Sequence, residues 1–289
     1  MLTNHARGII FMLLSAVIFA VMAALVRGVS VNPYTMVMVR FVIGTLVCLA
    51  IFATGRDRPR WTSWGWLLGR GIVGGIAVIL LYWAIQHVGL GKAQMLSYTY
   101  VVFAAVLAVP VLGERLRPLQ WLAVAVAMVG VVLLCDVQTL SFSAADGIAL
   151  LSGLCSAVAV ICVTRCRATD TSTNIFWSQS IFGGLIAVWP TATNWQTPAP
   201  SQWVWLLAIA FTAAAGQLAM TYAYKHTGAS QGSLLSLVTP VLSAVMGVMY
   251  FQEHFSLGFV IGSLLILAAC AYMAINPVQQ AEKIAPRGE

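Results

Sequence analysis

Two long apolar stretches with the same plan decide the fold of this chain. Residues 96–134 are LSYTYVVFAAVLAVPVLGERLRPLQWLAVAVAMVGVVLL, and residues 234–273 are LLSLVTPVLSAVMGVMYFQEHFSLGFVIGSLLILAACAYM. Each contains an apolar run that ends in a glutamate, then a short turn, then a second apolar run that contains glycine. Glu114 and Glu253 occupy the same place in the two stretches. The chain therefore carries the same pair of helices twice.

The repeat extends over almost the whole chain. A shift of 139 residues, from Glu114 to Glu253, aligns the first half with the second without a gap, and pairs Gly44 with Gly183 and His87 with His226. Duplicated apolar units are typical of secondary transporters, whose two repeats enclose a central site. We assign residues 1–136 to a first five-helix repeat, residues 147–276 to a second repeat, and residues 277–289 to a cytoplasmic tail.

Composition places the chain in a membrane. Hydrophobic residues make up 61% and charged residues 8% of the 289 residues, too few polar side chains to cover a soluble globule. About 20 apolar residues span the hydrocarbon layer. The expected spans are 8–27, 34–54, 64–86, 93–112, 118–135, 147–165, 173–193, 202–224, 230–250 and 256–275. The fold class is therefore an all-α membrane protein with ten transmembrane helices in two inverted five-helix repeats, since an odd number per repeat reverses the second.

The basic residues give the expected orientation. Most of the 15 Lys and Arg residues, Arg70 among them, fall at span ends or loops on the side of the N-terminus, whereas Arg27 and Lys92 fall on the opposite side. Both termini are therefore expected in the cytoplasm. The net charge of +7 then indicates contact with membrane lipids and gives no support for nucleic-acid binding. A cleaved signal peptide after Arg7 is the competing interpretation, but it would leave the first repeat one helix short.

A third motif makes the resemblance specific. YTMVMVRFVIGTL at residues 34–46 places Arg40 inside the second span, one turn before Gly44. Together with the two stretches above and the duplicated unit, this chain resembles the EamA-type family of the drug/metabolite transporter superfamily. The resemblance implies a ten-helix carrier in a bacterial inner membrane that moves small metabolites, often by exporting amino acids or toxic compounds. One departure is Val101, which stands where the first repeat would match Pro240. We therefore expect a hinge at Pro240 and no equivalent break in the fourth span.

Polar residues inside the spans are the candidates for binding. Arg40 costs at least ~2.5 kcal/mol inside a membrane unless it reaches a cavity or a partner, so it either binds a substrate carboxylate or reaches outward to helix carbonyls. The candidate substrate-binding residues are Arg40, Tyr82, Tyr98, Trp177, Gln179, Gln217, Thr221 and Tyr224. Ser233, Ser236 and Thr239 are expected to bond to neighbouring helices or to carbonyls of their own helix instead. Gly71 and Gly75 are expected to allow close helix packing, and Glu114 is expected to cap the helix that follows it.

These residues favour a carrier over other classes. His87 and His226 end spans on opposite sides, so we expect no metal site, no cofactor and no enzyme activity. The ATP-binding pattern GxxxxGK[ST] is absent, so transport is expected to use gradients. The predicted function is a secondary transporter of amino acids or a similar small metabolite, and the duplication favours a monomer. An exporter of cationic or aromatic drugs, with aromatic walls that bind cations, stays open, as do a channel and a scaffold.

Overall fold

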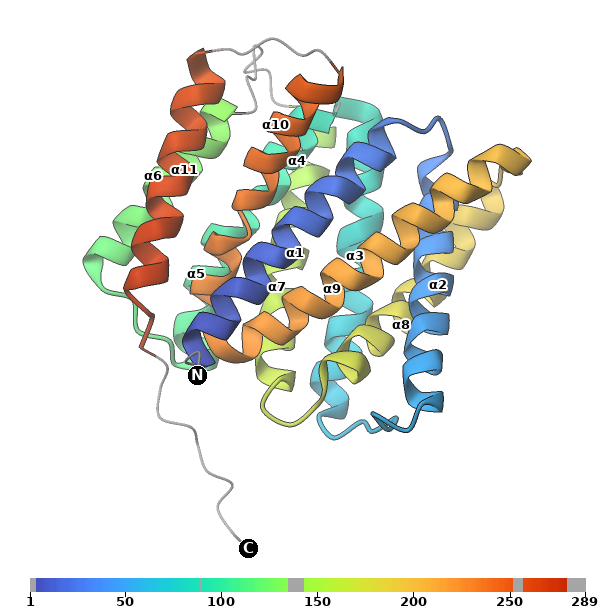
Figure 1. The fold of residues 1–289 in the computed structure, drawn as a ribbon, viewed down its shortest axis with the longest axis horizontal. Helices are drawn as coiled ribbons and strands as arrows, with labels where there is room; N and C mark the ends of the chain where they lie inside the picture. The colour runs from blue at the N-terminus through green and yellow to red at the C-terminus, as the bar shows by residue number, and fades with distance from the viewer. Residues whose placement is uncertain (1–3, 89, 135–142, 252–256, 280–289) are drawn as a thin grey trace, which may run out of the picture.

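The computed structural model describes residues 4–88, 90–134, 143–251 and 257–279, which form a bundle of helices (Figure 1). The helices in these ranges are α1 (Asn4–Arg27), α2 (Pro33–Ala53), α3 (Trp64–Val88), α4 (Leu90–Tyr98), α5 (Tyr100–Leu112), α6 (Pro118–Leu134), α7 (Ala144–Cys166), α8 (Ser172–Thr193), α9 (Pro200–Leu235), α10 (Val238–Phe251) and α11 (Leu257–Ile275). The beginning of α1 meets the end of α11, where His5 Nε2 lies 3.1 Å from the carbonyl oxygen of Ala274. The two ends of the bundle's chain therefore lie at the same edge.

The surface of the bundle suits lipid. Five of the described helices are long and apolar enough to cross a membrane, and three further apolar helices are shorter. Large apolar side chains point outward; Leu185 is 63% exposed and Leu264 is 62% exposed. Exposed apolar surface on this scale is unfavourable in water but not in a hydrocarbon layer. The chain is a multi-pass membrane protein.

The two halves pack on each other through equivalent pairs of helices. α1 packs on α9 and its counterpart α7 packs on α3, while α2 packs on its own counterpart α8 and α6 on its counterpart α11. The turn between α1 and α2 lies at the upper edge in Figure 1, and the equivalent turn between α7 and α8 lies at the lower edge. The halves therefore run in opposite directions within the bundle, and the space between them is bounded by both.

The fourth and ninth expected spans are each divided, which corrects the sequence expectation for the fourth. The fourth span is α4 and α5, which meet at Thr99, and the ninth span is the end of α9 followed by α10. The Thr99 hydroxyl donates to the Leu96 carbonyl (2.5 Å) and the Ser236 hydroxyl to the Ser233 carbonyl (2.6 Å). Such bonds to a carbonyl one turn earlier compete with the helix ladder and bend it. A hydroxyl, and not proline, is therefore the feature that the two breaks share.

Pro240 lies just after the second break, in the first turn of α10. The backbone N–H groups in the first turn of a helix have no partner within the helix, so the missing N–H of proline costs no hydrogen bond there. Pro240 therefore suits the start of a helix that begins at Val238. Its role as a hinge stays a prediction.

A further change of direction lies within α9, at Gly228. Its φ of 74° and ψ of −179° are not helical, and a positive φ favours glycine because it has no Cβ. The backbone N–H groups of Ala229 and Ser230 then begin a new helical segment, and they donate to the two carboxylate oxygens of Glu114 (2.6 and 3.0 Å). Glu114 therefore caps a helix of the other repeat, which corrects the expectation that it caps the following helix. Glu253 lies outside the described residues.

Close packing of α3 on α8 depends on small residues. A Cβ atom on Gly75 would come within 2.5 Å of the Gly183 Cα, and one on Gly71 within 2.7 Å of the Ser178 carbonyl oxygen. The two backbones are in direct contact at these points. This brings polar residues of α8 next to α3, where the cavity described below lies.

Candidate functional site

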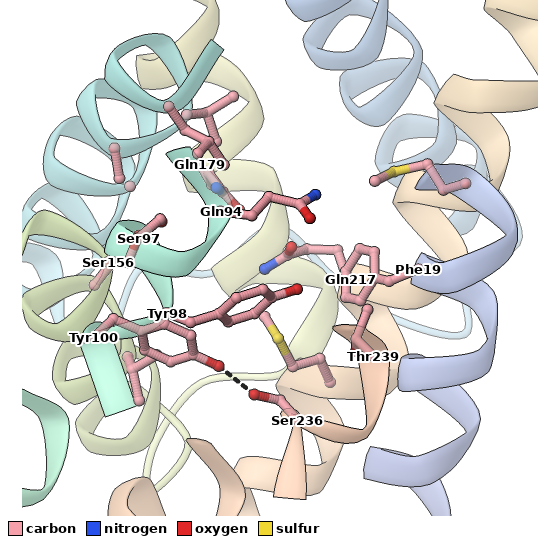
Figure 2. Close-up of a pocket in the computed structure, with 18 of the residues that line it drawn as sticks. Phe19, Gln94, Ser97, Tyr98, Tyr100, Ser156, Gln179, Gln217, Ser236 and Thr239 are labelled. Atoms are coloured by element: carbon pink, nitrogen blue, oxygen red, sulfur yellow. Dashed lines mark hydrogen bonds between the residues drawn. The ribbon is translucent and has the colours of Figure 1, made fainter. Parts of the chain in front are cut away.

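A cavity of about 270 Å³ lies between the two repeats. Its walls come from α1, α2, α3, α4 and α5 of the first half and from α7, α8, α9 and α10 of the second. Figure 2 shows Gln94 and Gln217 extending into it from opposite sides, with Tyr98 between them and Ser236. The two broken spans both contribute, so the cavity sits where the chain changes from one helical segment to the next.

Five of the eight candidate binding residues from the sequence line this cavity. They are Arg40, Tyr98, Gln179, Gln217 and Tyr224. Arg40 is half-buried, and among the residues that the structure describes no carboxylate contacts it. The Gln217 side chain is 3% exposed, and its buried Nε2 has no hydrogen-bond partner among the described residues. These five of the eight side chains that the sequence proposed for one site therefore line one cavity, and they come from both repeats.

The other three candidates lie outside the cavity lining. Tyr82 is buried in an apolar cluster with Met36 and Phe41, and Thr221 is completely buried. Trp177 packs on two aromatic rings, with centroid distances of 5.2 Å to Phe52 and 5.6 Å to Trp61. These positions explain the three residues by helix packing, and the aromatic residues that line the cavity are Phe19, Tyr98, Tyr100 and Tyr224.

Arg70 is the main cavity residue that the sequence did not predict. It was expected at a cytoplasmic helix end, but it lines the cavity and is only 5% exposed. Its Nη2 donates to the Gln179 Oε1 (2.7 Å), and its buried Nε has no hydrogen-bond partner among the described residues. The available signal for a place in the cavity was the position of Arg70 along α3. It is the seventh residue of the helix, about 9 Å from the helix start at 1.5 Å per residue.

Hydroxyl groups link the two broken spans at the floor of the cavity. The Tyr100 hydroxyl, at the start of α5, is hydrogen-bonded to the Ser236 hydroxyl at the end of α9 (Figure 2). It also lies 3.4 Å from the Ser233 carbonyl oxygen. Ser236 and Thr239 line the cavity, whereas the Ser233 hydroxyl donates to the Ser230 carbonyl (3.1 Å). Ser233 and Ser236 therefore make the expected hydrogen bonds to carbonyls of their own helix, and Ser236 and Thr239 also line the cavity.

The loop between α2 and α3 is fixed to the second repeat at the lower edge of the bundle. The Asp170 carboxylate accepts hydrogen bonds from the backbone N–H groups of Thr62 (3.0 Å) and Ser63 (3.1 Å), directly before α3. Asn174 accepts from the Arg60 N–H (3.2 Å). Burial lowers the pKa of the neighbouring Arg167, whose Nη1 donates to the Asp170 carbonyl (2.6 Å). This network ties the two repeats together at one end.

Three buried carboxylates in the described part of the chain have the same use. Glu114, Asp146 and Asp170 each accept hydrogen bonds from backbone N–H groups at the start of a helical segment. Negative charge is favourable there because of the helix dipole. None of the three lines the cavity. In the same part of the chain no group of three or more His, Cys, Asp or Glu residues is placed to hold a metal ion.

Antiparallel repeats, broken helices and a cavity between them that is partly lined by polar side chains define a membrane transporter of the inverted-repeat class. The model of the EamA-like transporter family matches residues 6–135 and again residues 143–275. The chain belongs to the EamA-like transporter family, with two EamA domains, and it is not an enzyme.

Similar proteins cover nearly the same length. The pseudopaline exporter CntI of Pseudomonas aeruginosa is 26% identical over 91% of this chain and 94% of its own length. Human solute carrier family 35 member G1 is 24% identical over 96% of this chain and 81% of its own. A protein of known crystal structure has the same fold, with a TM-score of 0.75, 17% identity, and coverage of 94% of this chain and 95% of that one.

Proposed function

We propose that this chain is a secondary transporter of small carboxylate-bearing metabolites, with amino acids as the first class to test. The observation that carries the proposal is Arg40, a half-buried cation that lines the central cavity with no acidic partner among the described residues. A charged side chain inside a membrane protein is costly unless it is paired. A substrate carboxylate would supply the missing partner and would be held in place by the charge.

The proposed topology follows from the antiparallel halves and the basic residues. Ten spans cross a bacterial inner membrane, with both termini in the cytoplasm, and the two repeats rock around the cavity in alternating access. Gradients supply the driving force. Pro240 and the two breaks, which lie beside the cavity, are the proposed places where the helices bend.

A second candidate is export of a metallophore, favoured by the relative named as a pseudopaline exporter, which matches over almost its whole length. An exporter of cationic drugs is less well supported by the site. Arg40 and Arg70 both line the cavity, and two cations repel a third. The tyrosines that would attract a cation share that space with them.

The test is counterflow in proteoliposomes with labelled amino acids, a metallophore and organic cations. We expect saturable exchange of amino acids by the wild type and at least a tenfold rise in half-saturation for Arg40→Gln. Arg115→Gln is the matched control, because Arg115 is exposed at the bundle edge. Exchange of cations alone, or an Arg40→Gln variant that is folded and has unchanged affinity, would refute the carboxylate role.

A further inference from the structure

The cavity holds two guanidinium groups. Arg40 comes from α2 and Arg70 from α3, and both line the same space of about 270 Å³. Like charges that share a site with little water repel each other strongly. An empty cavity therefore carries an electrostatic cost that an anion between the two groups would remove.

The surrounding chain does not neutralise this charge. No Asp or Glu is among the described residues that line the cavity. The buried carboxylates Glu114, Asp146 and Asp170 are bonded to backbone N–H groups at helix starts elsewhere. For the same reason the cavity offers no carboxylate to the ammonium group of a zwitterion. A solute with more negative than positive charge fits better than a neutral amino acid does.

The position of Arg70 is built by its neighbours. Gly74 provides space for the Arg70 side chain, because a Cβ atom at Gly74 would come within 2.6 Å of Arg70 Nη1. Gln179 holds the Arg70 Nη2 at 2.7 Å. Arg70 Nε and Gln217 Nε2 are buried donors without partners among the described residues. Buried donors without acceptors are costly. Both the positive charge and the unused donors therefore favour a ligand rich in oxygen acceptors.

We propose that the cavity binds solutes with two anionic groups, one for Arg40 and one for Arg70, so that the substrates are dicarboxylates, including acidic amino acids. This inference rests on the proposed carrier function and narrows its substrate class. A space of about 270 Å³ lies near the lower end of small-ligand pockets, which range over about 300–1,000 Å³, so it suits a small solute. Four- and five-carbon dicarboxylates are of this size.

The repeat alignment agrees with a site that has one charged side. Under the shift of 139 residues, Arg40 aligns with Gln179 and Arg70 with Ile209. All the positive charge of the described cavity lining thus comes from the first repeat, and the second supplies amides and hydroxyls. A solute with both carboxylates on one side and a less polar remainder on the other would match this division.

The test compares solutes that differ in one carboxylate. Counterflow in proteoliposomes would be competed with aspartate or asparagine, glutamate or glutamine, and succinate or its monoamide succinamate. We expect the wild type to prefer each dicarboxylate by at least tenfold in half-saturation. Arg70→Gln should abolish this preference while it still exchanges the monocarboxylates, and Arg70→Lys should restore part of it. Arg115→Gln should behave like the wild type.

The outcomes separate this inference from the function that it rests on. Exchange of monocarboxylates with no preference for dicarboxylates would overturn the two-anion site and leave the carboxylate carrier intact. No exchange of any carboxylate would overturn both. An equal loss for both members of each pair in Arg70→Gln would show a structural role for Arg70 and overturn the assignment. Because the comparison of solutes on the wild type needs no variant, it tests the two-anion site even where Arg70→Gln does not fold.

Discussion

Glu114 offers a direct test of how the two repeats hold each other. Its carboxylate is 2% exposed and accepts the backbone N–H groups of Ala229 and Ser230, which follow the bend at Gly228. Glu114→Ala would leave two buried donors without an acceptor, at a cost of about 1–3 kcal/mol each. It would also remove a negative charge from a helix start, which contributes up to ~2 kcal/mol where partly buried. Because these effects overlap, we expect a total loss of about 3–5 kcal/mol.

The measurement is thermal unfolding of the purified protein in one detergent. At roughly 2 °C per kcal/mol for a chain of this size, Glu114→Ala should lower the midpoint by about 6–10 °C. Glu114→Gln keeps one acceptor oxygen and should lose about half as much. The control is Arg115→Ala, since Arg115 is exposed and, among the described residues, only its backbone N–H is bonded, to the Gln279 carbonyl (2.9 Å). A Glu114→Ala midpoint within 2 °C of the wild type would refute the capping role.

Three further predictions concern packing, the lower edge and the cavity wall. Gly75→Ala would force the α3 and α8 backbones apart, because its Cβ would lie 2.5 Å from the Gly183 Cα. We expect thermal unfolding to show a loss of about 1–3 kcal/mol in stability. Gly65→Ala should show no loss, because a Cβ there meets nothing within 4 Å. Asp170→Ala should free the loop before α3, seen as faster tryptic cleavage at Arg60 than in the wild type or in Asp57→Ala; equal rates would contradict the tie. Trp177→Phe should leave the half-saturation for substrate within twofold, because Trp177 lies outside the cavity lining, and a tenfold rise would place it in the substrate path.

Much of the architecture is encoded by simple patterns. Apolar length located most helices to within a few residues, as with residues 173–193 against α8 (Ser172–Thr193), although α9 (Pro200–Leu235) extends well beyond the expected span 202–224. The shift of 139 residues between the repeats paired the segments that occupy equivalent positions in the packing of the bundle. These features were predictable because a membrane requires long apolar helices with all backbone bonds satisfied. The sequence missed the break at Thr99, since a hydroxyl bond to a carbonyl one turn earlier leaves no signal that distinguishes it from any other threonine in a span.

The site was predictable where a residue type is unusual for its depth, and missed where depth was misjudged. Arg40 stood out because it lies well inside a span. Arg70 was counted with the loop residues because it is near the start of α3, although an arginine side chain is long enough to reach inward from there. Tyr82 and Trp177 were proposed because they are polar aromatics within spans. Tyr82 and Trp177 lie on helix faces that direct both side chains into packing clusters. Which helix face is packed depends on the neighbouring helices.

The use of acidic residues links the fold to the substrate. A membrane bundle with inverted repeats and broken spans creates new helix starts inside the protein, and each start has backbone donors that need acceptors. Glu114 and Asp170 serve starts in the opposite repeat, so these carboxylates hold the repeats together and do not enter the cavity. Arg40 and Arg70 then remain without acidic partners in the described lining. The charges that stabilise the bundle and the charges that line the cavity are thus kept apart, which supports the proposal that an anion supplied from outside binds there.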